Sequence, residues 1–316
     1  MLIEKGFRKG VNLGGWMSQC DYSRERLETF ITEPDFAQIK EWGFDHVRIP
    51  VDYNLFQNPD GSLIETGFRY LDKAVALCEK YGLLLILDLH KTAGFSFDEG
   101  ETEDGFFDST EYQEMFYLLW EEFARRYGND PDHIVFELLN EVTDQSYIEK
   151  WNRIAETCIR RIRAIAPETI ILIGSFNNNG VREVPYLEQP YDSNVIYNFH
   201  CYEPLLFTHQ GATWTVRIDP ETRVSFENSG TSAAYFEDLF ADALRKAAEN
   251  HTCLYCGEYG MIDIASAEDS LKWFKAIHNV FEKHGIARSV WTYKGMDFGL
   301  TAPKYDGIRE ELLQYL

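Results

Sequence analysis

The stretch Ile134-Val135-Phe136-Glu137-Leu138-Leu139-Asn140-Glu141 begins as an apolar run and ends on two polar residues. A continuous apolar run of this length is typical of a parallel strand that is covered on both faces. Burying an unpaired carboxylate is costly, so a glutamate at the end of such a strand is expected to have a charged or hydrogen-bonding partner, or a functional role. Similar strand-like runs lie at 10–13, 46–50, 83–89, 170–174, 195–199, 254–257 and 289–291, and the run quoted above covers 134–139.

Helix-period segments separate these runs, at 32–43, 67–81, 110–127, 146–166, 234–250 and 266–284. The alternation predicts an α/β fold, a closed (β/α)8 TIM barrel. An open doubly wound sheet is the alternative, but Val11-Asn12-Leu13-Gly14-Gly15 lacks the GxGxxG spacing expected after its first strand. Because the sequence contains no linker or low-complexity stretch, we predict a single catalytic domain over residues 1–316.

A second glutamate repeats the pattern, in Leu254-Tyr255-Cys256-Gly257-Glu258. The carboxyl ends of barrel strands meet at one face, and the long loops 91–109 and 203–233 would lie there too. Glu141 and Glu258 would then face each other across one cleft, as glycoside hydrolysis requires of its two carboxyl groups. The plainer alternative is that each glutamate caps a helix. We interpret Gly257 as leaving room for a sugar.

The net charge of −22, from 52 acidic and 30 basic residues, argues against nucleic acid and anionic membranes as partners. The N-terminus has no signal-like apolar region, so we expect a cytoplasmic protein, or a secreted one whose signal has been removed. The six cysteines are scattered, which favours reduced thiols. We expect a monomer.

Polar or aromatic residues end almost every predicted strand. Together with Gly10-Val11-Asn12-Leu13-Gly14-Gly15-Trp16, this set resembles glycoside hydrolase family 5 over about residues 6–300. The stretches 30–33, 45–48, 195–200, 255–258 and 290–298 are most similar to its clostridial endo-β-glucanase branch. The residues that carry the resemblance are Arg48, His90, Asn140, Glu141, His200, Tyr202, Glu258 and Trp291.

The resemblance implies a retaining mechanism in which Glu141 is the general acid/base and Glu258 the nucleophile. Arg48 would keep Glu258 ionised through charge-assisted hydrogen bonds. Glu137 has the same strand parity as Glu141 but lies deeper, so we predict a structural ion pair or hydrogen bond for it. Glu137 is also the alternative partner of Arg48.

Asn140 would bind the sugar 2-hydroxyl. Adjacent strand residues point to opposite faces, so Asn140 and Glu141 can both serve only if the strand ends or bulges there. His90 and His200 could indicate a metal, but barrel metallohydrolases usually show a His-x-His on the first strand, and this chain has none there. We therefore expect hydrogen-bonding histidines, no metal and no cofactor.

The remaining candidates are aromatic. Tyr202 has the same strand parity as His200 and could reach Glu258. Trp291 would form a floor on which a pyranose ring stacks. Trp214 and Phe207, in the loop 203–233, could add sugar platforms.

The leading expectation is an endo-β-glucanase that cleaves β-1,4- or mixed-linkage β-glucan oligo- or polysaccharides. An exo-β-1,3-glucanase, a β-glucosidase and a β-mannanase would use the same residues. The stretch between the sixth and seventh strands is shorter than in the clostridial branch, so endo and exo action both remain open. A catalytically inactive carbohydrate-binding barrel and a metal-dependent barrel hydrolase are the alternatives of other classes.

Overall fold

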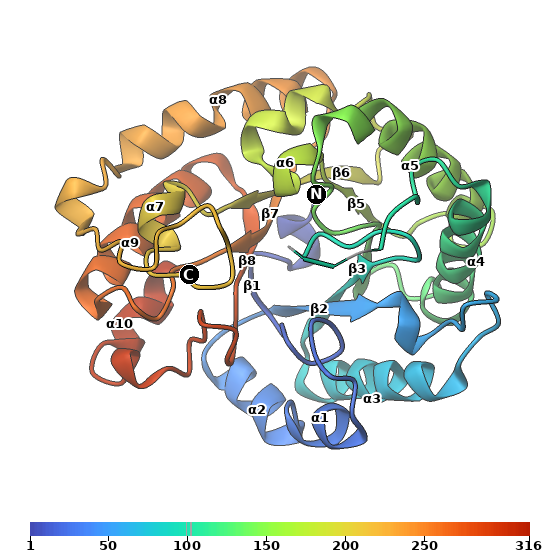
Figure 1. Ribbon diagram of the computed structural model, residues 1–316, viewed down its shortest axis with the longest axis horizontal. Helices are drawn as coiled ribbons and strands as arrows, with labels where there is room; N and C mark the ends of the chain where they lie inside the picture. Colours follow the sequence, from blue (N-terminus) through green and yellow to red (C-terminus); the bar gives the residue numbers. More distant parts are fainter. Residues whose placement is uncertain (99, 102) are drawn as a thin grey trace.

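The computed structural model describes residues 1–98, 100–101 and 103–316. Within these residues, eight parallel strands close into a barrel whose strands neighbour one another in chain order. The predicted (β/α)8 barrel is therefore confirmed (Figure 1). The strands are β1 (Lys9–Asn12), β2 (His46–Asp52), β3 (Leu84–Lys91), β4 (Ile134–Glu137), β5 (Ile171–Ile173), β6 (Val195–Cys201), β7 (Leu254–Tyr259) and β8 (Ala287–Val290).

Helices surround the barrel, and the long ones agree with the sequence periodicity within a few residues (Figure 1). Their apolar faces pack on the strands, and serine side chains cap four of the helices: Ser23, Ser109, Ser232 and Ser266. The helices are α1 (Arg24–Thr29), α2 (Glu33–Glu41), α3 (Glu65–Tyr81), α4 (Thr110–Tyr127), α5 (Ile148–Arg163), α6 (Phe176–Asn179), α7 (Leu205–Thr208), α8 (Ala233–Glu249), α9 (Ala267–His284) and α10 (Arg309–Leu312).

The connection between β5 and β6 differs from the others. It holds only the short α6 and a 3₁₀ helix, Val181–Tyr186, where a long helix would complete the repeat. Asn177 and Asn178 in α6 have left-handed backbone angles, so this segment is a tight turn rather than a regular helix. The turn comes close to the carboxyl end of β4.

Side chains fill the barrel end opposite the carboxyl ends of the strands. Phe7 and Tyr255 belong to an inner apolar cluster there, and both are fully buried. The His46 ring joins the cluster through Tyr255 Oη, 2.9 Å from its Nε2, and Asp45 Oδ1, 2.5 Å from its Nδ1. Because this end is packed shut, a substrate can enter only at the opposite end.

Two further findings concern the cysteines and the helices. The six cysteines are free thiols, as predicted. In the part of the chain that the structure describes, none of the helices has the length and apolarity needed to cross a membrane.

Candidate active site

A cleft opens at the carboxyl ends of the strands. It has two connected parts, and Glu141 and Tyr202 line both of them. The two long loops identified in the sequence contribute Phe97, Asp98 and Trp214 to both parts. The residues that distinguish the first part are Tyr22, His90, Glu258 and Trp291, and those that distinguish the second are Asn178, Arg182 and Glu203.

Glu141 reaches the cleft because β4 ends early. The strand stops at Glu137, two residues short of the predicted end, and Asn140 then donates its backbone N–H to Leu89 O at 3.1 Å. Glu141 has a left-handed φ of 43°. This is the irregularity predicted for the Asn140–Glu141 pair, and it places Asn140 against Arg48 while the Glu141 side chain, 12% exposed, enters the cleft.

Glu258 lies within β7, at an irregularity in the register between β6, β7 and β8. Its side chain is 6% exposed. Arg48 Nη1 donates to Glu258 Oε1 at 2.7 Å, and Tyr202 Oη donates to Oε2 at 2.8 Å. Each carboxyl oxygen of Glu258 thus accepts a hydrogen bond from a different side chain. The predicted contacts of Arg48 and Tyr202 with Glu258 are therefore present.

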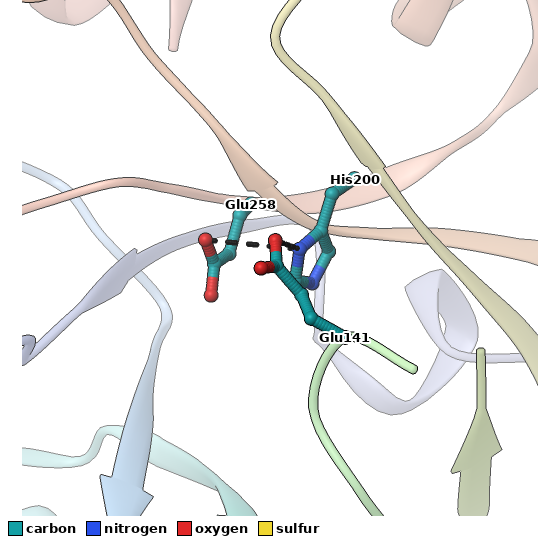
Figure 2. A group of neighbouring side chains, drawn as sticks. All are labelled: Glu141, His200 and Glu258. Atoms are coloured by element: carbon teal, nitrogen blue, oxygen red, sulfur yellow. Dashed lines mark hydrogen bonds and ion pairs between the residues drawn. The ribbon is translucent and has the colours of Figure 1, made fainter. Parts of the chain in front are cut away.

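The two carboxyl groups meet at His200 (Figure 2). His200 Nδ1 lies 2.8 Å from Glu141 Oε1 and 3.7 Å from Glu258 Oε2. One oxygen of each carboxyl group and the imidazole nitrogen all lie within 4.8 Å of one another. Retaining glycosidases hold their carboxyl groups about 5–5.5 Å apart, whereas inverting enzymes need about 6.5–9.5 Å to admit a water molecule. The short separation between the two carboxyl groups favours retention of the anomeric configuration.

Arg48 is the hub of the buried polar groups. Its Nε and Nη2 donate to the two oxygens of Glu137 at 2.7 and 2.8 Å, and Nη1 donates to Glu258. Nη2 also lies 3.0 Å from Asp88 Oδ2, and Arg48 is fully buried. The sequence offered Glu258 and Glu137 as alternative partners of Arg48, but the guanidinium pairs with both. The predicted structural ion pair of Glu137 is present.

Removing the Arg48 charge should destabilise the fold as well as the site. Arg48→Met would leave buried carboxylates without their cation, and breaking a buried pair costs about 3–5 kcal/mol. We expect a loss of that size in the free energy of unfolding, measured by urea denaturation. As a control, Arg48→Met combined with Glu137→Met should recover part of the stability and none of the activity. A single variant as stable as the wild type would contradict the hub.

Burial makes the surroundings of the two glutamates unequal. It raises the pKa of Glu141 to about 7, although the Asn178 hydrogen bond opposes the shift. Burial also lowers the pKa of His200 and of His90 to about 4 each, so both imidazoles are neutral at neutral pH. Such a pair, with one carboxyl group whose pKa lies near 7 and a second one held by Arg48, has the chemistry needed for one acid and one nucleophile.

Asp88 is a buried polar residue that the sequence analysis missed. Its Oδ2 lies 2.5 Å from His90 Nδ1 and contacts Arg48, and burial raises the pKa of this carboxyl group to about 7. Asp88 therefore orients the His90 ring from the side of the barrel interior. The signal was available, because Asp88 and His90 are two residues apart on β3 and share a face.

The aromatic candidates have different outcomes. Trp291 lines the first part of the cleft, and its ring lies parallel to that of His90 with centroids 5.9 Å apart. Trp214 is 47% exposed and lines both parts. The prediction for Phe207 is wrong: its side chain is 1% exposed and packs towards Phe226, because α7 turns that face into the core.

Gly257 lies against two side chains of the neighbouring strand. A Cβ there would lie 2.7 Å from Asn198 Oδ1 and 3.1 Å from His200 Nε2. Both groups are on β6, so the glycine allows β7 to pack closely against the side chains of β6.

Glu141, His200 and Glu258 carry the donor atoms a metal ion would need. The Arg48 guanidinium lies against Glu258, however, and already uses one of its oxygens. A fixed positive charge at that distance repels a cation. The cluster therefore suits proton transfer and covalent chemistry better than metal binding.

Comparisons with known proteins find similarity along almost the whole chain. The model of the family Cellulase (glycosyl hydrolase family 5) matches residues 7–297. Cellodextrinase A of Ruminococcus flavefaciens is 66% identical over 288 residues, which cover 91% of this chain and 86% of that protein. Endoglucanase C of Acetivibrio thermocellus is 36% identical over an alignment of 337 positions, which covers 98% of this chain and 98% of that protein. The structure of Thermotoga maritima Cel5A in complex with cellobiose matches with a TM-score of 0.85 and 26% identity, covering 100% of this chain and 99% of that one.

Proposed function

The chain belongs to glycosyl hydrolase family 5, and on that premise we propose that it hydrolyses β-1,4-linked or mixed-linkage β-glucans with retention of anomeric configuration. The observation that carries the proposal is the pair Glu141 and Glu258. One carboxyl oxygen of each lies within 4.8 Å of the other, and the two side chains have different hydrogen-bond partners. We also propose that residues 1–316 act as one catalytic domain, and the single closed barrel supports this.

In the first step, a glucose unit stacks on Trp291 with its anomeric carbon above Glu258. A Glu258 oxygen attacks that carbon as the glycosidic bond breaks, and the proton of Glu141 passes to the leaving oxygen. The products are a glycosyl ester of Glu258 and a leaving saccharide whose freed hydroxyl carries the proton from Glu141. Asn140, fixed by Arg48 Nη2 at 2.9 Å, would hold the 2-hydroxyl.

In the second step, Glu141 is ionised and acts as a base. It removes a proton from water, the hydroxide oxygen bonds to the anomeric carbon, and the ester bond to Glu258 breaks. Glu141 regains its proton, and Glu258 leaves as a carboxylate. Arg48 and Tyr202 favour that departure because both donate to the carboxylate oxygens.

The substrate class rests on the relatives. One relative is named a cellodextrinase and another an endoglucanase, and a related structure contains cellobiose. A second structure of the Thermotoga protein contains mannotriose, so mannan is the second candidate substrate. Cello-oligosaccharides, barley β-glucan, laminarin and mannan should therefore be compared.

Mixed-linkage β-glucan is the first substrate to test, with reducing ends and viscosity followed together. We expect new reducing ends at the highest rate on β-1,4-linked or mixed-linkage glucans. A rapid fall in viscosity would establish endo action, and slow release of small sugars would establish exo action. A dominant rate on mannan would contradict the proposal, and binding without new reducing ends would favour the inactive-barrel alternative.

The rate should depend on pH through Glu141. Its raised pKa of about 7 keeps the acid protonated below that pH, so kcat/KM on β-glucan should fall as pH rises through about 7. Above that value we expect a loss approaching tenfold per pH unit. A dinitrophenyl cellobioside, whose leaving group needs no proton, is the control and should show a much weaker alkaline limb. An equal limb on both substrates would assign it to another group.

A further inference from the structure

The turn after β5 has an unusual backbone. Asn177, Asn178 and Asn179 are consecutive, and all three have positive φ, at 53°, 57° and 53°. Residues other than glycine rarely adopt this region, and asparagine is among the few that tolerate it. Three such residues in succession are unfavourable locally, so contacts with other segments must stabilise this conformation.

This turn is bonded to the segment that follows Glu141. The backbone N–H of Asn177 donates to Thr143 O at 3.2 Å, and that of Asn178 donates to Val142 O at 3.0 Å. Asn178 Nδ2 donates to Glu141 Oε2 at 3.1 Å. The other oxygen of Glu141 faces His200, so each carboxyl oxygen has one polar neighbour.

The arrangement also leaves buried polar atoms without partners. Among the described residues, Asn178 Oδ1 and both amide atoms of Asn179 have no hydrogen-bond partner. Unpaired buried atoms and left-handed residues both cost stability, and their coincidence beside an acid/base residue is typical of a functional site.

Resting on the proposed function, we propose that Asn178 is a positioning residue for Glu141. The αL turn brings its amide to Glu141 Oε2, where the N–H fixes the carboxyl plane and stabilises the ionised form that the second step uses. Asn178 thereby balances the two states of Glu141, because burial favours the acid and the amide favours the base.

Other charged or titratable groups act on Glu141 from the surrounding strands and loops. They would remain unchanged in a variant of Asn178, so a matched comparison isolates the amide. These groups are Arg48, Asp88, Asp98, His200, Tyr202, Arg217 and Glu258.

Glycine substitutions provide that comparison because glycine adopts positive φ without strain. Asn178→Gly removes the amide beside Glu141, whereas Asn177→Gly removes one that donates to Glu183 at 3.2 Å. We expect the alkaline limb of kcat/KM to move up by about 0.5–1 pH unit in Asn178→Gly and to stay in place in Asn177→Gly. Equal shifts in both variants, or no shift in either, would overturn the proposal.

A second variant and a substrate-free measurement separate this proposal from the proposed function. Asn178→Asp places a like charge beside Glu141 and should raise its pKa more than the glycine does. ¹³C NMR of labelled glutamate carboxyls, with the Glu141 signal assigned by its absence in Glu141→Gln, reads that pKa without any turnover. If the wild type fails to cleave glucans, the titration still decides the role of Asn178. An unchanged Glu141 pKa in both Asn178 variants would refute it.

Discussion

Glu258→Ala is expected to lower kcat/KM on β-glucan by about 10⁴-fold or more, because no other group can form the covalent bond to the anomeric carbon. The carboxylate lies between hydrogen-bond donors from Arg48 and Tyr202, which hold its two oxygens in place. Substrate binding should persist, since Trp291 and the cleft walls are unchanged. Activity assays together with isothermal titration of cellobiose would measure both effects.

Added azide distinguishes loss of the nucleophile from misfolding. The alanine leaves space below the sugar, so azide can attack the anomeric carbon of an activated aryl cellobioside from that face. One displacement inverts the configuration, and the product should be the α-glycosyl azide. A β-glycosyl azide, or activity within tenfold of the wild type, would assign the nucleophile to another residue.

Glu141→Ala is expected to have an effect that depends on the leaving group. On β-glucan the leaving alkoxide needs the proton, so loss of the acid should cost about 10³-fold. On a dinitrophenyl cellobioside the first step needs no acid, and the glycosyl ester should form rapidly and then accumulate because water lacks its base. A burst of dinitrophenol in stopped-flow measurements would show this.

Two outcomes bear on the acid/base assignment. With Glu141→Ala, azide should restore turnover and give the β-glycosyl azide, since azide attacks the glycosyl ester from the face that Glu141 occupied. Equal losses on both substrates, with no burst, would remove Glu141 from the acid/base role.

The barrel and the family could be predicted from the sequence because their signals are local. Buried parallel strands are continuous apolar runs, and the run 134–139 was recognisable without knowledge of its neighbours. The meeting of Glu141 and Glu258 followed from topology, since strand ends of a closed barrel converge. The irregularity at Asn140 followed from side-chain parity together with the roles that the resemblance implied for Asn140 and Glu141.

Other features depend on contacts between distant segments. Asp88 reads as one polar residue in an apolar strand, and only the fold shows Arg48 3.0 Å away. The left-handed turn at Asn178 depends on backbone bonds to residues 142 and 143. Phe207 was misassigned because a loop aromatic gives no sign of which way it faces until α7 is placed.

The Arg48 hub also limits how such an enzyme can change over generations. One guanidinium joins residues from β2, β3, β4 and β7, so exchanging Arg48 would leave three buried carboxyl groups without their shared cation. Single substitutions of Arg48 at the centre of the barrel are therefore unfavourable. Trp214 is on an exposed loop, so exchanging it would leave no buried charge unpaired. New substrate preferences would therefore arise first at the rim, while the reacting centre is inherited as one indivisible unit.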